Sequence, residues 1–418
     1  MPLIKPFAGL RPAPGRAADV AAPPYDVMNA AEARSMVDGR PWSFLHISRP
    51  EVDLPTDVNP FADAVYAKAR ENLRHMIDAG VLIRDPGPCY YVYRLSMGTH
   101  VQTGLVAAAS VAAYDSGRIK MHEFTRPAKE DDRVRQIDAL DAQTGPVFLV
   151  YRANREIDEV LAQGCQTAPT VDITADDRVR HQIWTLDDAA TLGRLSAAFD
   201  SLYALYVADG HHRSAAASRV AATRRTTHPG PDQGPAEDAA HEYFLSVIFP
   251  HDQMQILPYN RVLRDLNGLE PATFMDRVGA AFQIESSDSP VQPTEPAEFG
   301  MYLDGQWYRL LRLDPQRIPA DDPVARLDVS LLQDNLIGPI LGIGDPRRDE
   351  RIDFVGGIRG LDGLTSRVDS GEMRIAFSLR ATQMDDLMAV ADAGKVMPPK
   401  STWFEPKLAD GLVSHMIE

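Results

Sequence analysis

The feature of this sequence that most constrains its fold is an apolar segment, residues 202–208, that stops abruptly at Asp209-Gly210. The residues that follow, 214–225, are rich in alanine and have a high helix propensity. A buried strand, a glycine and a helix in this order are typical of proteins in which strands and helices intermix. The sequence therefore predicts an α/β class (mixed α+β), with a strand over 203–208 and a helix from 214.

Apolar segments typical of strands and segments typical of helices recur along the chain, but the sequence has no internal repeat. Further helices are expected over residues 30–37, 60–79, 129–143 and 187–202. Further strands are expected over residues 43–47, 89–95, 103–114, 146–151 and 243–250. Three regions follow as an expected division: residues 1–120 as an N-terminal α/β region, 121–265 as a core with the Asp209 turn, and 266–418 as a C-terminal α/β region that closes the site.

Charge and cysteine content disfavour several classes of function. The 418 residues carry a formal charge of −16, which argues against a general surface for nucleic acid or an anionic membrane. Cys89 and Cys165 match no metal spacing and fit a reducing compartment. The first residues lack a signal peptide's apolar core, and the apolar stretch 105–113 is about half of a bilayer span. We expect a cytoplasmic protein with neither nucleic acid nor membrane as a partner, and leave the oligomeric state open.

The block Asp209-Gly210-His211-His212-Arg213 collects anion-binding groups at the start of the predicted helix. A helix start directs free N–H groups at an anion, and Gly210 lets a phosphate approach the backbone. Arg213 would form two hydrogen bonds to phosphate oxygens, with His211 and His212 as further donors. Asp209 would hold Mg²⁺ or take a proton from a hydroxyl.

Two alternatives stand beside this phosphate site. In the first, Asp209 only caps the helix. Cationic donors crowded at the positive end of a helix are unfavourable unless an anion receives them, which favours the phosphate site. In the second, His211 and His212 bind zinc, but adjacent residues on a turn rarely point at one metal.

Four other residues are candidates for catalysis or phosphate binding. Glu123 lies at a junction before a charged helix and would be a second acid, unless it only caps that junction. Asp26 is held on a stiff loop after Pro23-Pro24, although it would also serve in an Asx turn. Lys129 and Arg133 would contact phosphates or form a solvated helix face.

Candidate substrate-binding residues lie in three further segments: His46, Arg49, Arg261, Lys400, Ser401 and Lys407. His46 is also compatible with a buried structural histidine, and Arg261 with a plain ion pair. Lys400 and Lys407 lie on a loop stiffened by prolines, which is typical of an anion site. No Gly-x-x-x-x-Gly-Lys-Ser/Thr loop is present, so an ordinary P-loop enzyme is excluded.

These blocks together resemble the bacterial and archaeal domain of unknown function 1015 family nearly end to end. The residues that carry the resemblance are 22–27 (Ala-Pro-Pro-Tyr-Asp-Val), 44–50, 122–125, 129–133, 208–213, 257–261 and 397–407. The Asp209 block is also similar to the phosphate loop of the ParB/sulfiredoxin-like fold. Sulfiredoxin has Gly-Cys-His-Arg there, whereas free serine kinases have Asp-Gly-x-x-Arg. His211 replaces the catalytic cysteine, which argues against sulfinic acid reduction, and Asp209 favours the kinase branch.

The resemblance implies a ParB/sulfiredoxin-like nucleotide-binding core and leads to the hypothesis of a small-molecule kinase. It would phosphorylate serine or a related hydroxy acid, with ATP or ADP as co-substrate and Mg²⁺ as cofactor. Asp209, Glu123 and Asp26 would be catalytic. A phosphatase or other hydrolase that uses the same anion site is one alternative, and a non-catalytic ParB-like nucleotide-binding regulator is another.

Overall fold

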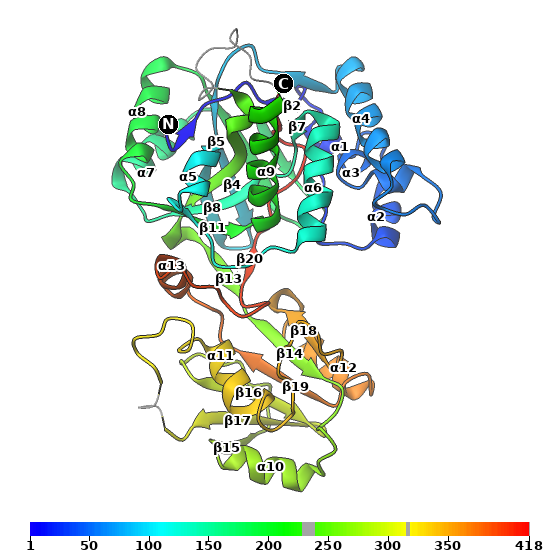
Figure 1. Ribbon diagram of the computed structural model, residues 1–418, viewed down its shortest axis with the longest axis vertical. Coiled ribbons are helices and arrows are strands. Elements are labelled where there is room, and N and C mark those ends of the chain that lie inside the picture. Colours follow the sequence, from blue (N-terminus) through cyan, green and yellow to red (C-terminus); the bar gives the residue numbers. More distant parts are fainter. Residues whose placement is uncertain (228–238, 315–317, 418) are drawn as a thin grey trace. The chain divides into compact units, whose positions relative to one another are not determined.

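A computed structural model describes residues 1–227, 239–314 and 318–417 of the chain. It has two compact units, unit 1 (Met1–Met254 with Pro406–Glu418) and unit 2 (Gln255–Glu405), coloured along the chain in Figure 1. Helices and strands alternate in both units, so the predicted mixed α/β class is confirmed. Unit 1 contains two separate segments of the chain, because the chain returns to it at Pro406.

Unit 1 is built on a nine-stranded mixed sheet in the order β6-β11-β8-β12-β5-β4-β10-β9, with β1 beside β5. The pairs β6–β11 and β8–β12 are parallel and the other neighbours are antiparallel. The strands of unit 1 are β1 (Ile4–Lys5), β2 (Leu10–Pro12), β3 (Leu82–Arg84), β4 (Tyr90–Met97), β5 (His100–Ser110), β6 (Ile119–Lys120), β7 (Ala142–Gln143), β8 (Val147–Tyr151), β9 (Val171–Thr174), β10 (Arg180–Leu186), β11 (Leu205–Asp209), β12 (Tyr243–Pro250) and β21 (His415–Met416). Strand β8 is buried along its whole length, as its continuous apolar sequence requires.

The last residues of the chain are tied to the first part of unit 1 by backbone pairing. His415 pairs with Gln143, and Asp410 forms a bridge with Ala22. These long-range pairs explain why residues from 406 onward share the core of unit 1.

The helices of unit 1 are α1 (Ala17–Val20), α2 (Ala30–Val37), α3 (Leu45–Ser48), α4 (Asp63–Asp78), α5 (Val111–Asp115), α6 (Pro127–Leu140), α7 (Arg155–Gly164), α8 (Ala189–Asp200) and α9 (His211–Thr227). Helices α6 and α9 pack side by side (Figure 1). Asn29 begins α2 with a capping box, in which it accepts from the Glu32 N–H and Glu32 accepts in return.

Two of the expected strands are corrected. Residues 43–47 contain the start of the short helix α3 rather than a strand, because Phe44, Leu45 and Ile47 are all buried and a short apolar run does not distinguish the two structures. The strand expected to reach residue 114 ends at Ser110, whose side chain caps α5.

Unit 2 has a six-stranded antiparallel sheet in the order β15-β17-β16-β19-β14-β18, and a separate pair β13–β20. Its elements are β13 (Gln255–Leu257), β14 (Tyr259–Leu263), α10 (Pro271–Gly279), β15 (Phe282–Ser287), β16 (Glu298–Leu303), β17 (Gln306–Arg312), α11 (Asp328–Leu332), β18 (Ile352–Gly356), α12 (Asp362–Asp369), β19 (Ile375–Leu379), α13 (Met384–Asp392) and β20 (Trp403–Glu405). The unit has its own apolar cluster, which includes Val262, Trp307 and Leu364.

None of the helices in the described residues combines the length and the apolar character that a membrane span requires.

Candidate functional site

The turn between β11 and α9 has the strand, glycine and helix order that the sequence predicts. Gly210 has φ +96°, which favours glycine, and a Cβ there would lie 3.3 Å from the Val147 Cα. The N–H groups of Arg213 and Ser214 both bond to the Gly210 carbonyl, at 2.9 and 3.0 Å. Helix α9 therefore begins at His211, and its first N–H groups have no acceptor within the helix.

Asp209, at the end of β11, accepts a hydrogen bond from Lys407. The distance from Lys407 Nζ to Asp209 Oδ2 is 3.2 Å. Burial alone would raise the pKa of Asp209, but the charges of Lys407 and Arg213 hold that pKa below its ordinary value. The structure thus brings Lys407, expected only as a substrate-binding residue, directly to the strand end.

His211 is buried against His122 from the loop before α6. The two rings pack edge to face with centroids 4.6 Å apart. Neither His211 Nε2 nor His122 Nδ1 has a partner in the described part of the chain. Burial lowers the pKa of His122 to about 4 and that of His211 well below its ordinary value. Both rings are neutral at neutral pH, which corrects the assumption that His211 adds a positive charge to the turn.

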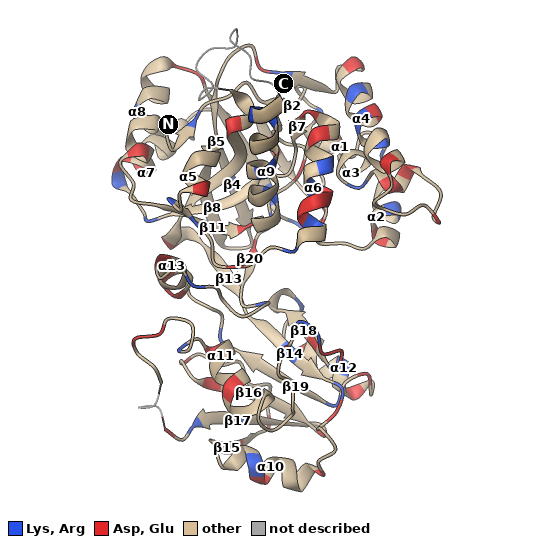
Figure 2. Cartoon of the chain, in the orientation of Figure 1, with Lys and Arg blue, Asp and Glu red and all other residues tan. Residues whose placement is uncertain are grey.

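His212 positions the loop of residues 121–126 over the start of α9. Its Nε2 accepts from the Arg126 N–H at 3.0 Å, so this nitrogen is not free to donate to a phosphate. Burial, followed by nearby Lys129, lowers the pKa of His212. Glu123 is exposed on this loop and Lys129 is exposed on the first turn of α6. Figure 2 shows that α6 carries charges of both signs.

Arg213 is held within a cluster of polar groups rather than at the helix start. Its guanidinium donates to the Pro146 carbonyl and lies 3.5 Å from Asp26. Its side chain is only 10% exposed, and its Nε has no partner among the described residues. Burial alone would lower the pKa of Arg213, but the negative charges of Asp26 and Asp209 raise it above the ordinary value. Asp26, a predicted catalytic residue, is therefore placed beside Arg213.

A cavity of about 30 Å³ lies next to Arg213. The lining residues that matter here are Tyr25, Ser48, Arg133, Gly145, Arg213 and Asp410. Arg133 pairs with Asp132 and lies over the Tyr25 ring, 3.9 Å from its centroid.

Asp410 is the functional candidate that the sequence prediction missed. It is 1% exposed, and burial raises its pKa to about 7 in spite of the nearby Arg213 charge. Its Oδ1 has no partner among the described residues. The pair Asp410-Gly411 repeats the Asp-Gly of the central turn, but the same pair also occurs at residues 38–39, 304–305 and 362–363, so it does not single out Asp410.

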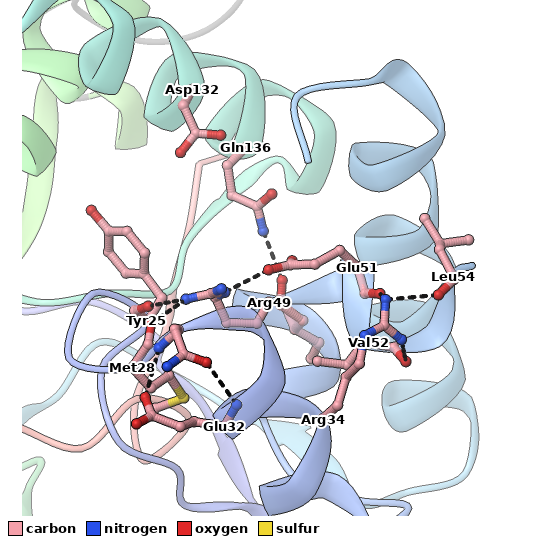
Figure 3. A network of polar contacts seen from close by, with 12 residues as sticks. Tyr25, Met28, Glu32, Arg34, Arg49, Glu51, Val52, Leu54, Asp132 and Gln136 are labelled. Carbon is pink, nitrogen blue, oxygen red and sulfur yellow. Dashed lines mark hydrogen bonds and ion pairs between the residues drawn. The ribbon is translucent and has the colours of Figure 1, made fainter. Parts of the chain in front are cut away.

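Two predicted substrate-binding residues, Arg49 and His46, have structural partners instead. Arg49 donates to the carbonyls of Tyr25 and Met28 at 2.8 Å and to Glu51 at 2.6 Å. Figure 3 shows Arg49 at the centre of these contacts. It fixes the loop that presents Tyr25 and Asp26. His46 bonds to Asp53 at 2.9 Å and to the Arg40 carbonyl at 3.2 Å.

The remaining predicted residues lie in unit 2. Arg261 is buried, donates to the carbonyls of Tyr259 and Lys400, and faces the Phe354 ring at 5.1 Å. Lys400 lies 5.4 Å from the centroid of the Tyr259 ring. Ser401 donates to the Pro398 carbonyl at 2.6 Å.

No group of three or more His, Cys, Asp or Glu side chains within residues 1–227, 239–314 and 318–417 is arranged to hold a metal ion. Magnesium that accompanies a nucleotide needs only one or two protein carboxylates besides the phosphates. Asp209 is of the right chemistry for that limited task.

Comparison with protein families matches residues 4–330 to a family described as "Protein of unknown function (DUF1015)". The chain belongs to this family. The match to the DUF1015 family contains the turn Asp209 to Arg213 and ends before Lys407, which bonds to Asp209, and before Asp410. No curated protein matches the chain.

Solved structures similar to this DUF1015 protein are distant. A conserved hypothetical protein from Pyrococcus furiosus is 13% identical, with 73% of this chain and 93% of that chain covered and a TM-score of 0.34. A free serine kinase in complex with AMP is 13% identical, with coverages of 73% and 92% and a TM-score of 0.34. SbnI with a C-terminal truncation, from Staphylococcus aureus, is 11% identical, with coverages of 73% and 85% and a TM-score of 0.37. These similarities are too distant to carry a functional conclusion.

Proposed function

We propose that this DUF1015 protein binds a nucleotide through its phosphates at the start of α9 and transfers a phosphoryl group to a small hydroxy acid such as serine. The observation that supports the proposal most strongly is the buried His211 Nε2. This nitrogen has no partner among the described residues, at a helix start where backbone N–H groups are also without intrahelical acceptors. An anion at this point would satisfy these groups and the helix dipole together.

Each side chain near the turn has a task in this proposal. The N–H groups of His211 and His212 and the ammonium of Lys407 would hold the phosphates, and Gly210 would let them approach. Mg²⁺ would be bound by the phosphates and Asp209, and would offset the negative charge that develops during transfer. Glu123, which is exposed on the loop of residues 121–126, and Asp26, which lies 3.5 Å from Arg213, remain proposed as catalytic carboxylates. The other residues predicted to bind phosphate or substrate, such as Lys129 and Lys400, also remain proposals.

The test is an assay of the purified full chain with ATP or ADP, Mg²⁺ and a set of hydroxy acids that includes L-serine. We expect a phosphomonoester product, detected by ³¹P NMR, and a shortened nucleotide. The absence of nucleotide consumption with every acceptor would contradict the proposal. Phosphoester hydrolysis without a nucleotide would indicate a hydrolase, and nucleotide binding without turnover would indicate a ParB-like regulator.

Replacing Lys407 sharpens this test. We expect Lys407→Ala to weaken nucleotide binding by about 10- to 100-fold, since a hydrogen bond from a charged donor contributes about 1.5–3 kcal/mol. Lys68→Ala is the matched control, because Lys68 lies on the surface of α4 and is bonded to Glu71. Titration calorimetry of both variants with ADP and ATP measures the difference. Equal affinities in the two variants would remove Lys407 from the phosphate site.

A further inference from the structure

Three residues that line the cavity beside Arg213 each have a buried polar atom that lacks a partner among the described residues. These atoms are Ser48 Oγ, Arg213 Nε and Asp410 Oδ1. Ser48 is 5% exposed and Asp410 is 1% exposed, so bulk water does not satisfy these atoms. An unmade hydrogen bond of this kind costs about 1–3 kcal/mol, so three in one cavity indicate a place for a molecule that completes them.

The chemistry of these atoms restricts what the molecule presents to the cavity. The Arg213 Nε–H can only donate, and an ionised Asp410 oxygen can only accept. A carboxylate accepts but does not donate, and Asp410 would repel it. An ammonium group donates but does not accept, and Arg213 would repel it. A hydroxyl group is both donor and acceptor, and the cavity volume of about 30 Å³ is large enough for it, since a single water molecule needs about 10–15 Å³ of such space.

We infer that this cavity receives the hydroxyl group of a small alcohol, whose oxygen accepts from Arg213 Nε–H and whose hydrogen is donated to Asp410 Oδ1. The Ser48 hydroxyl is able to serve a second polar atom of the same molecule. Gly145 keeps the cavity open: a Cβ at this position would lie 3.3 Å from Arg213 Cδ and 3.7 Å from Asp410 Oδ1.

This inference deepens the proposed function and rests on it for one chemical step. The hydroxyl oxygen forms a bond to the terminal phosphorus of the nucleotide, and the bond from that phosphorus to the bridging oxygen breaks. The hydroxyl proton passes to Asp410, and the nucleotide leaves one phosphate shorter. Asp410 suits a general base because burial raises its pKa to about 7, close to the pH at which it would work. Arg213 lies close enough to Asp26 and Asp410 for their charges to raise its pKa, and its guanidinium orients the acceptor.

The experiment is titration calorimetry of the full chain with matched pairs of compounds that differ by one hydroxyl group. L-Serine is compared with L-alanine, and 3-hydroxypropionate with propionate, each with and without ADP and Mg²⁺. We expect at least one hydroxylated member to bind about 100-fold or more tightly than its partner, because a site built for a hydroxyl rejects the analogue that lacks it. Equal binding within both pairs, or no binding of either hydroxylated member at millimolar concentration, would overturn the inference.

Two glycine variants separate filling of the cavity from a general effect on the fold. Gly145→Ala adds one methyl group to the cavity without changing a charge, and we expect it to lower the affinity for the hydroxylated compound at least tenfold. Gly193→Ala, on α8 with no atom within 4 Å of its added Cβ, is the control and should bind as the wild type does. Unchanged binding in Gly145→Ala would show that the cavity holds only water, and would overturn the inference.

Asp410→Asn tests the proton transfer. We expect its kcat to fall at least 100-fold while its nucleotide affinity stays within about threefold of the wild type. A kcat close to that of the wild type would overturn the role of Asp410. The two proposals fail separately. If hydroxylated compounds bind preferentially but no nucleotide binds, the inference about the cavity stands and the proposed kinase function is contradicted. If the enzyme turns over without a preference for the hydroxylated compounds, the kinase function stands and the inference about the cavity is contradicted.

Discussion

Unit 1 and unit 2 each contain a buried arginine that the sequence marks as a candidate ligand-binding residue, and the two are bonded in different ways. Arg213 in unit 1 lies near the carboxylates of Asp26 and Asp410 and keeps its Nε without a partner in the described chain. Arg261 in unit 2 donates to backbone carbonyls and faces the Phe354 ring, and burial lowers its pKa to about 10.

This difference separates an arginine that is arranged for a ligand from one that supports a loop. Arg261 ties the chain at Lys400 to β14 through main-chain acceptors, which is a structural task. Arg213 lies near one exposed and one buried carboxylate, Asp26 and Asp410, and lines a cavity with an Nε that has no partner in the described chain. The residue type in a motif does not distinguish these two tasks, whereas the presence of unsatisfied polar atoms does.

The largest effect is expected for Arg213→Met. Loss of the guanidinium removes a positive charge that acts on the buried Asp410 and on Asp26, and leaves Arg133 as a weaker positive neighbour of both. Breaking a buried ion pair in this way costs about 3–5 kcal/mol. Native-state hydrogen exchange measures the stability of the unit 1 sheet separately from that of unit 2. A loss below about 1 kcal/mol would mean that these carboxylates do not depend on Arg213.

A smaller effect is expected for Arg261→Met. The variant removes the side-chain donor to the carbonyl groups of Tyr259 and Lys400, but no carboxylate loses a positively charged partner. The stability of the unit 2 sheet should therefore fall by about 1–3 kcal/mol. Hydrogen exchange of β14 and β19 amides reports it. A loss equal to that of Arg213→Met would abolish the distinction between the two arginines.

The smallest effect, when it is taken over a single pH unit, is a change in the pH dependence of stability in Asp410→Asn. The pKa of Asp410 is about 7 in the folded protein and 3.8 as the ordinary value. Between these values the folded chain retains a proton that the unfolded chain releases, so this carboxyl group makes stability fall as pH rises from about 4 to 7. Relative to the wild type, Asp410→Asn should therefore gain on the order of 1 kcal/mol for each pH unit in that window.

Urea unfolding at several pH values measures this gain. His122 and other buried histidines with lowered pKa values have the opposite slope from about pH 4 to 6.5, but wild type and variant share them. Parallel pH profiles of the two proteins would contradict the raised pKa of Asp410.

The parts of the site that depend on local sequence were predictable. The strand, Gly210 and helix order follows from apolar content, helix propensity and the need for positive φ at one position. The capping box at Asn29 follows from a four-residue pattern.

The parts that depend on long-range contacts were not predictable from one sequence. Asp410 reaches Arg213 because the end of the chain pairs with Ala22 and Gln143, and no local pattern encodes that return. The neutral state of His211 depends on burial against His122, which lies in a different segment. The helix at Leu45 replaced an expected strand because burial on all sides removes the periodicity that distinguishes the two.

The central claim is that nucleotide phosphates bind at the start of α9, and selective ¹⁵N labelling of histidine tests it most directly. The chain contains 11 histidines, so a labelled sample gives a simple amide spectrum. We expect saturating ADP or ATP with Mg²⁺ to shift the amide signals of His211 and His212 most strongly, while His100, at the start of β5, stays in place. If those two signals remain unchanged when nucleotide is saturating, or if no nucleotide binds, the phosphate site is not at this helix.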